Sequence, residues 1–288
     1  GDNWAEPDAE AYASLVESTG CIKRWDASPE LPGALEFARY LKEKGIVATI
    51  SHTEAEYPEV KAAFEAGFTH VSHFYNGMPG FHKNREYKYE GTVESVYLID
   101  DMTIELIADG RHLPDTILRL ASKVKGVEKT CLVTASLAYA GVDAKEVNDP
   151  KIIIEDGVCK SRDLKQLVGS VATMDVLVQN MVKAGVSLED TLRMATETPA
   201  KIMGVYDRKG SLEKGKDADI LILNHSLLIA NAAIEKGFLP ELPFLVIDEA
   251  QHLVVHKCHG CGKIFRLYYS DDEIYRTLPT FIVSTVDK

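Results

Sequence analysis

The sequence predicts an α/β protein whose strands form a parallel sheet. Short apolar runs alternate with amphipathic helical patterns from about residue 20 to about residue 205. The alternation has a spacing of roughly 20–35 residues, which is typical of strand–helix units with parallel strands. The strands are nearly continuous apolar runs, as expected where both faces of a sheet are covered.

The elements follow one another in a regular order. The expected strands are residues 21–27, 45–51, 69–75, 103–108 and 129–134, each a short apolar run. The expected helices have an amphipathic pattern and are residues 33–44, 57–66, 114–124, 171–184 and 188–196. Strand and helix periodicities therefore support the same fold class.

Polar side chains lie at the ends of several expected strands, namely Asp26, Ser28, His52, His73, Asp109 and His112. This placement is typical of a (β/α) barrel, whose site lies at the C-terminal face of the strands. Only about five strands are expected, whereas the closed barrel has eight. The sequence therefore predicts a partial (β/α)8 barrel whose sheet has two open edges.

Three segments differ in composition. We expect residues 1–205 to be the barrel portion and residues 206–223, a turn-rich stretch leading into a short apolar strand, to be a small β element. Residues 224–288 are more aromatic and are expected to form an extra C-terminal α/β segment. The chain begins with Gly1 and ends on a strand-like run at 280–288, so both ends look cut.

The chain is acidic, with 32 basic and 44 acidic residues and a net charge of −12. This charge repels phosphate, so binding to nucleic acid or to an anionic membrane surface is not expected. No apolar run reaches the ~18 residues of a membrane span, and no signal peptide begins the chain. The five cysteines are an odd number and mostly scattered, which favours reduced thiols and a cytoplasmic location.

Two histidines are candidates for a metal centre. His52 follows one expected strand, and His73 lies at the end of the next. Neighbouring strands are about 5 Å apart, so two neutral imidazoles there can share one ion. The alternative for His52 is a hydrogen-bonding histidine in a loop. His70 lies three residues before His73 and faces the opposite side of the strand, so it is expected to be structural. Asp109 fits either a metal ligand or a cap of the turn that follows it.

The chain resembles the N-acetylglucosamine-6-phosphate deacetylase family over roughly residues 1–223. Seven motifs agree in order and spacing, at residues 27–35, 50–55, 72–79, 104–112, 132–141, 168–175 and 209–219. The resemblance implies an amidohydrolase barrel with a small β domain. It also implies hydrolysis of the N-acetyl group of an amino-sugar phosphate, a homodimer, and a divalent metal (zinc, iron, manganese or cobalt) held by His52 and His73.

The same resemblance implies a set of substrate-binding positions, which are Asn76, Gly77, Arg85, His112, Val168, Gly169 and Ser170. Asn76 and Gly77 match positions that contact the sugar phosphate. Arg85 matches an arginine that reaches the phosphate, often across a dimer. His112 matches a histidine that contacts substrate, and the turn at 168–170 matches a loop that packs on the sugar.

Two departures from the family pattern bear on activity. The catalytic aspartate of the family falls at Ala135, whose methyl group transfers no proton. Losing a general acid–base group typically costs 10²–10⁴-fold in rate, and Ser136 does not replace a carboxylate. The metal-binding glutamate of the family belongs to a motif upstream of residue 1. We therefore expect little or no turnover. An engineered change, a degenerate homologue and an artificially composed sequence all fit Ala135.

The C-terminal segment, residues 219–288, resembles pieces of superfamily-2 helicases, in which Asp248 and Glu249 would bind Mg²⁺. The rival function is therefore a remnant of a nucleic-acid-dependent ATPase, or a non-catalytic binding module. The phosphate-binding GxxxxGK[ST] motif is absent from the sequence, which disfavours ATP hydrolysis. Cys258 and Cys261 form half of a zinc-ribbon pattern and would be either a second metal site or free thiols.

Overall fold

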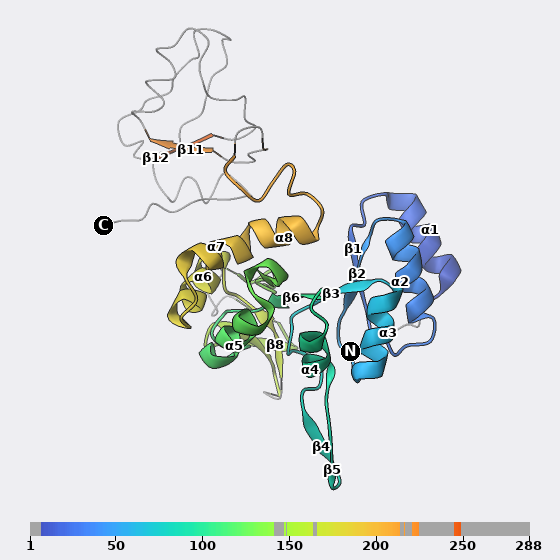
Figure 1. Cartoon of the computed structure of the whole chain (residues 1–288). Coiled ribbons are helices and arrows are strands. Elements are labelled where there is room, and N and C mark those ends of the chain that lie inside the picture. Colours follow the sequence, from blue (N-terminus) through green and yellow to red (C-terminus); the bar gives the residue numbers. More distant parts are fainter. Residues whose placement is uncertain are drawn as a thin grey trace. The chain divides into compact units, whose positions relative to one another are not determined.

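The computed structural model describes residues 7–140, 147, 149–163, 166–213, 216, 221–224 and 245–248 of the 288-residue chain. The chain divides into two compact units, residues 1–216 and residues 217–288. In the second unit, β11 (Leu221–Asn224) pairs in parallel with β12 (Leu245–Asp248). The first unit holds the parallel sheet and the predicted site residues up to Ser170 (Figure 1).

The first unit is built on a five-stranded parallel sheet with the order β1–β2–β3–β6–β7. Its strands are β1 (Arg24–Ala27), β2 (Val47–Ile50), β3 (Phe68–Val71), β6 (Thr103–Leu106) and β7 (Thr130–Leu132). Each overlaps one of the five expected strands, so the predicted α/β class and the strand count are confirmed. The outer strands of this sheet are β1 and β7, as expected for a barrel portion that does not close on itself.

The helices alternate with the strands in chain order. They are α1 (Ala9–Thr19), α2 (Ala34–Glu43), α3 (Tyr57–Ala66), α4 (Thr92–Leu98), α5 (Asp115–Lys125), α6 (Met174–Lys183), α7 (Leu188–Ala195) and α8 (Glu197–Ile202), with a 3₁₀ turn at Val127–Lys129. The five expected helices are present as α2, α3, α5, α6 and α7. Helix α3 begins with a capping box between Glu56 and Glu59, and α5 ends at Gly126. The described helices are all too short or too polar to cross a membrane.

The two faces of the sheet differ in polarity. Helices α2, α3, α5, α7 and α8 pack against the strands, and the hydrophobic core includes Ile50, Val71, Ile104, Leu106 and Leu132. The opposite face carries Arg24, Asp26, Thr49, His70 and Glu105, because the register pairs Asp26 with Thr49 and Thr49 with His70. The prediction of nearly continuous apolar strands is therefore wrong for β1, β3 and β6. Of the polar residues on this face, Thr49, His70 and Glu105 are buried, Arg24 is half-buried and Asp26 is exposed.

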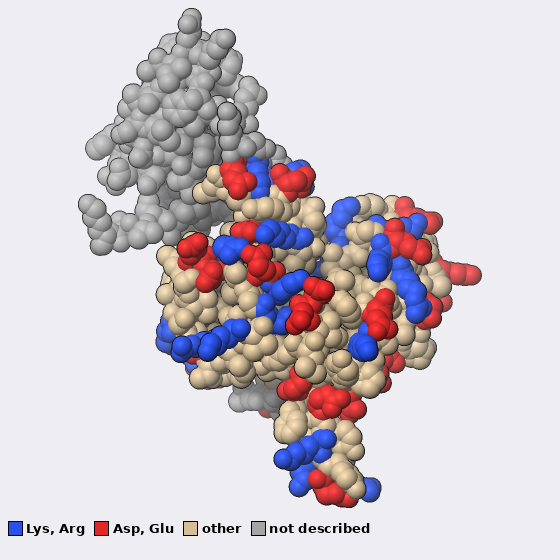
Figure 2. Space-filling model, in the orientation of Figure 1, with Lys and Arg blue, Asp and Glu red and all other residues tan. Residues whose placement is uncertain are grey.

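Two smaller β elements extend the first unit. The hairpin of β4 (His82–Asn84) and β5 (Tyr87–Tyr89) projects from the body (Figure 1). A three-stranded antiparallel sheet contains β8 (Ile152–Glu155), β9 (Val158–Ser161) and β10 (Leu167–Ser170). A parallel bridge between Ser136 and Ser170 joins β10 to the chain that follows β7. On the face shown in Figure 2, acidic and basic side chains are interspersed.

Candidate metal centre

The carboxyl ends of the parallel strands gather the residues that sequence analysis singled out. Ser28 follows β1, His52 follows β2, His73 follows β3 and Ala135 follows β7. Parallel strands end at the same edge of a sheet, so these residues share one edge. The hydroxyl of Ser28 donates a hydrogen bond to the backbone oxygen of His52 (2.7 Å), which ties the ends of β1 and β2 together.

His52 and His73 lie side by side. Their ring centroids are 4.7 Å apart, and the rings meet edge to face. Nδ1 of His73 is 3.0 Å from the backbone oxygen of Asn76, and a carbonyl oxygen accepts only, so Nδ1 carries the proton. In the neutral ring, this places the lone pair on Nε2 of His73, and Ser51 Oγ lies 3.2 Å from that nitrogen. This tautomer is the one that binds a metal through Nε2.

Electrostatics favour the neutral form of His52. Partial burial of the ring lowers its pKa, and the neighbouring His73 lowers it further. A neutral imidazole keeps the lone pair that a metal requires. The two histidines therefore place two candidate nitrogen ligands close together.

Backbone strain is concentrated at this edge. His52 (φ 47°), His73 (φ 31°) and Ala135 (φ 46°) all have left-handed backbones, which are uncommon for residues other than glycine. Such strain costs on the order of 1–3 kcal/mol per residue and clusters at functional sites. Apart from glycine, Asn, Asp and His are the residues most often found in this conformation. The backbone at position 135 therefore suits an aspartate better than the alanine present here.

Gly77 packs directly against His52. Its backbone oxygen accepts a hydrogen bond from Thr53 N (2.9 Å), and a Cβ added to Gly77 would lie 2.7 Å from Nδ1 of His52. The φ of Gly77 is +66°, which also favours glycine. The absence of a side chain at position 77 is therefore what leaves room for the His52 ring.

Gly77→Ala is expected to displace the His52 ring and to lower zinc affinity by about 10-fold or more, the size of effect seen when support of a ligand is lost. Gly45→Ala is the matched control, because Gly45 has φ +68° and no atom within 4 Å of the added Cβ. Both variants carry the same backbone strain, and only Gly77→Ala should change zinc binding in a calorimetric titration. Equal zinc affinity in the two variants would contradict this role of Gly77.

His112 is held by Asp109. Nδ1 of His112 lies 2.7 Å from Asp109 Oδ2, while the backbone N–H groups of Arg111 and His112 donate to Oδ1 (2.9 and 2.8 Å). Burial would raise the pKa of Asp109, but these hydrogen bonds outweigh it and lower the pKa to about 2. Asp109 is therefore a cap of the turn after β6, and its ionised carboxylate orients the His112 ring.

The remaining predicted substrate positions fall into two groups. Val168, Gly169 and Ser170, predicted to form a turn, belong instead to strand β10, which pairs with β9. The end of β10 lies beside Ala135, since Ser170 N donates to Ala135 O (3.0 Å). The amide of Asn76 donates to the backbone oxygens of His73 and Phe74. Arg85, by contrast, is exposed in the turn of the projecting β4–β5 hairpin. Asn76 and Ser170 therefore contact the residues at the carboxyl ends of the strands, whereas Arg85 does not. That any of these residues contacts a sugar phosphate stays a prediction.

A second group of ligand-type side chains lies on the inner face of the sheet. One ligand atom from each of His70, Glu105 and Cys131 lies within 4.8 Å of the others. His70 is buried and contacts Thr103 Oγ1 (2.6 Å) and Glu105 Oε1 (3.2 Å), and it is this histidine that faces the interior of the sheet. Its structural role stays a prediction. The guanidinium of Arg24 is also bonded to Glu105, and burial raises the pKa of Cys131. A cation at this group would have to displace Arg24 and ionise a buried thiol.

Glu105 and Arg24 are the polar residues that sequence analysis missed. Both are charged residues inside short strands of a parallel sheet, where charges are rare unless they are paired. That signal predicts a buried ion pair, although it does not say which strands meet. Cys258 and Cys261, the second metal site proposed from sequence, lie outside the described residues.

Comparison with known proteins gives one consistent result. The Amidohydrolase family matches residues 22–248. The chain is 31% identical, over 233 residues, to N-acetylglucosamine-6-phosphate deacetylase of Bacillus subtilis, and the match covers 77% of this chain and 56% of that protein. The family match includes β11 and β12, and the resemblance of residues 219–288 to helicases is not borne out.

Two solved structures support the same fold. N-acetylglucosamine-6-phosphate deacetylase from Pasteurella multocida matches with a TM-score of 0.67 and 32% identity, covering 75% of this chain and 56% of that one. An Asp-to-Ala mutant of the Mycobacterium smegmatis enzyme, in complex with N-acetyl-D-glucosamine-6-phosphate, matches with a TM-score of 0.67 and 29% identity. That match covers 75% of this chain and 57% of the mutant. This chain thus spans a little over half the length of the relatives that it matches.

Proposed function

This chain belongs to the amidohydrolase family, and from that premise we propose that it is part of a divalent-metal-dependent deacetylase of N-acetylglucosamine 6-phosphate. The observation that carries the proposal is the pairing of His52 and His73 at adjacent strand ends, with ring centroids 4.7 Å apart. The relatives named for this activity match at 29–32% identity. We propose in addition that the protein is cytoplasmic and that it forms a homodimer. In that dimer Arg85 would reach the phosphate of the substrate.

The metal is a zinc, iron, manganese or cobalt ion held by His52 and His73. Two imidazoles suit all of these ions, whereas a complete site needs a third ligand from outside this pair. When bound, such an ion polarises an amide carbonyl and acidifies a water. The chain's own residues orient the ligands, since Asn76 O fixes the His73 tautomer and Gly77 leaves room for the His52 ring.

The substrate is bound without efficient turnover. Ala135 offers no group that moves a proton, and the neighbouring Ser136 hydroxyl is already donated to the backbone oxygen of Ala172. The Asp-to-Ala mutant of a relative, solved in complex with N-acetyl-D-glucosamine-6-phosphate, is a precedent for substrate binding by a variant of this kind. His112, oriented by Asp109, is the side chain that we assign to substrate contact.

The test is a calorimetric titration of the full chain with zinc. Because Cys258 and Cys261 could bind zinc independently, all variants carry Cys258→Ser and Cys261→Ser. His52→Ala and His73→Ala are each expected to lower zinc affinity by at least about 100-fold, more than the loss of a supporting residue does. His82→Ala is the control, because His82 is an exposed histidine on the projecting hairpin. Equal zinc binding by all these proteins would overturn the proposal.

Substrate is tested separately, in the zinc-loaded chain. N-acetylglucosamine 6-phosphate should bind, and His112→Ala should weaken its binding while leaving zinc affinity unchanged. Acetate release should stay at the background rate because position 135 is alanine. Rapid acetate release by the unaltered chain would contradict the role given to Ala135. Failure of the sugar phosphate to bind would contradict the substrate assignment.

A further inference from the structure

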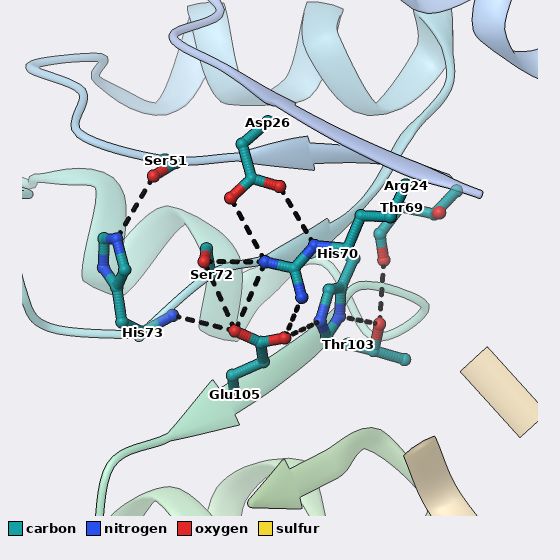
Figure 3. Close-up of polar contacts among 9 residues, drawn as sticks. All are labelled: Arg24, Asp26, Ser51, Thr69, His70, Ser72, His73, Thr103 and Glu105. Atoms are coloured by element: carbon teal, nitrogen blue, oxygen red, sulfur yellow. Dashed lines mark hydrogen bonds and ion pairs between the residues drawn. The ribbon is translucent and has the colours of Figure 1, made fainter. Parts of the chain in front are cut away.

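Glu105 is the centre of a buried hydrogen-bond network on the inner face of the sheet (Figure 3). Its Oε1 accepts from Arg24 Nη1 and lies 3.2 Å from His70 Nε2. Its Oε2 accepts from the Ser72 hydroxyl (3.3 Å) and from the backbone N–H of His73 (3.3 Å). Glu105 is only 5% exposed, so both oxygens depend on these protein donors.

Arg24 and His70 link the carboxylate of Glu105 to its neighbours. Arg24 also donates to both carboxylate oxygens of Asp26 (2.9 and 3.1 Å). The Thr103 hydroxyl donates to Thr69 O (3.1 Å) and lies 2.6 Å from His70 Nδ1, while His70 Nε2 faces Glu105 Oε1. Arg24 is therefore shared by two carboxylates, and His70 joins Glu105 to Thr103. The network is complete without a metal ion, and it holds Glu105 from the side opposite to His73.

Glu105 also fixes the chain that follows β3. Its side chain accepts from His73 N, and its backbone oxygen accepts from Phe74 N (2.8 Å). Ser72, the residue before His73, is bonded to the same carboxylate. One residue of β6 thus binds three consecutive residues around His73, whose φ of 31° is strained. Strain of this kind persists where neighbouring contacts hold it in place.

We propose that Glu105 is a positioning residue for the metal ligand His73, holding the left-handed turn that brings the His73 ring beside His52. This inference rests on the proposed metal site. Arg24 and His70 anchor Oε1 of Glu105, and Oε2, which also accepts from Arg24 Nη2 (3.4 Å), fixes the backbone of His73.

The Glu105→Gln variant tests whether the hydrogen bonds of Glu105 position His73, because the substitution keeps the volume of the side chain and changes its hydrogen bonding. A carboxylate accepts at both oxygens, whereas an amide accepts at its oxygen and donates at its nitrogen. The oxygen of the introduced amide would turn toward the guanidinium of Arg24. Its nitrogen would then face three donors, namely the N–H of His73, the hydroxyl of Ser72 and Nη2 of Arg24, where an acceptor is needed. Glu105→Gln should therefore release His73 while the volume of the side chain is preserved.

The experiment measures zinc affinity of the full chain, in the Cys258→Ser, Cys261→Ser background, together with ring ¹⁵N shifts of His73 in the metal-free chain. Glu105→Gln is expected to lower zinc affinity about 10–100-fold, the effect typical of residues that support a ligand. It should also shift His73 away from the single tautomer with a proton on Nδ1. Glu128→Gln is the matched control, because Glu128 is an exposed glutamate paired with Arg193 and Lys201.

The outcomes are distinguishable. Unchanged zinc affinity and unchanged His73 shifts in a folded Glu105→Gln variant would overturn the positioning role. If the parent chain binds no zinc through His52 and His73, the proposed metal site is wrong. The ring ¹⁵N shifts of His73 in the metal-free chain still decide whether Glu105 positions the His73 ring. Glu105→Asp keeps the charge for Arg24 and shortens the reach to His73, so it should fold and show the same loss. Unfolding of both variants would assign Glu105 to sheet stability and overturn the proposal.

Discussion

Arg24→Met is expected to lower the free energy of unfolding by about 3 kcal/mol at neutral pH, which is among the largest effects of a single substitution in this chain. Removing one partner of a buried ion pair typically costs about 3–5 kcal/mol, because the other charge is left in a poorly solvated place. The lower value applies because 25% of the Arg24 side chain is exposed, against 7% for Glu105. Urea unfolding followed by tryptophan fluorescence measures the effect, since one of the two tryptophans, Trp25, lies on the same strand as Arg24.

The pH dependence of this effect identifies the charge as its cause. Burial would raise the pKa of Glu105, but His70 and Arg24 outweigh it and lower the pKa to about 2, from an ordinary value of 4.5. Because the pKa of Glu105 is lower in the folded state than in the unfolded state, the ionised carboxylate stabilises the folded protein at pH values above its ordinary pKa. This stabilisation is lost as the pH falls from about 5 to about 2. Without Arg24 the pKa of Glu105 is higher. The difference between the parent chain and Arg24→Met should therefore shrink below about pH 4.

Arg193→Met is the matched control. Arg193 is paired with Glu128 and Glu197 at the surface, where such pairs contribute about 0–1 kcal/mol. It should change the free energy of unfolding by less than about 1 kcal/mol. A difference for Arg24→Met that stays constant between pH 7 and pH 3 would mean that Arg24 acts through the packing of its methylene groups.

The sequence predicted those strands and helices whose hydrophobic residues repeat with a regular period. Five strands and five helices were found because hydrophobic periodicity is set by which face an element buries. The β8–β9 hairpin was missed, although Asp156 and Gly157, with φ of 55° and 79°, form the turn that an Asp-Gly pair favours. Helix α4 was missed because it has only seven residues and depends on a capping interaction between Gly91 and Glu94.

The candidate site was predictable to a similar extent. His52 and His73 follow strands, so their position in the sequence places them at one edge of a parallel sheet. The pairing of Glu105 with Arg24 was not predictable, because it requires knowing that β1 and β6 face the same interior while two strands lie between them in the sheet. The left-handed backbones of His52, His73 and Ala135 were also hidden, since no local sequence pattern marks them.

The second large effect is expected at the base of the β4–β5 hairpin. Gly91→Ala should lower the free energy of unfolding by about 3 kcal/mol, the upper part of the range for overpacking. A Cβ at position 91 would lie 2.3 Å from the backbone oxygen of Pro79 and 2.8 Å from that of Gly80. Backbone atoms cannot rotate away as a side chain can. The φ of Gly91 is −111°, so the predicted loss comes from this close approach and not from backbone strain.

Gly80→Ala tests the argument on the other side of the same contact. A Cβ at position 80 would meet only Glu94 Oε1, at 3.7 Å, which is an ordinary van der Waals distance. We therefore expect Gly80→Ala to change the free energy of unfolding by less than about 1 kcal/mol, while Gly91→Ala loses about three times as much. Urea unfolding of both variants decides the matter. Equal stabilities would mean that the segments joining the hairpin to the sheet can separate at little cost, so that the hairpin moves independently of the metal centre.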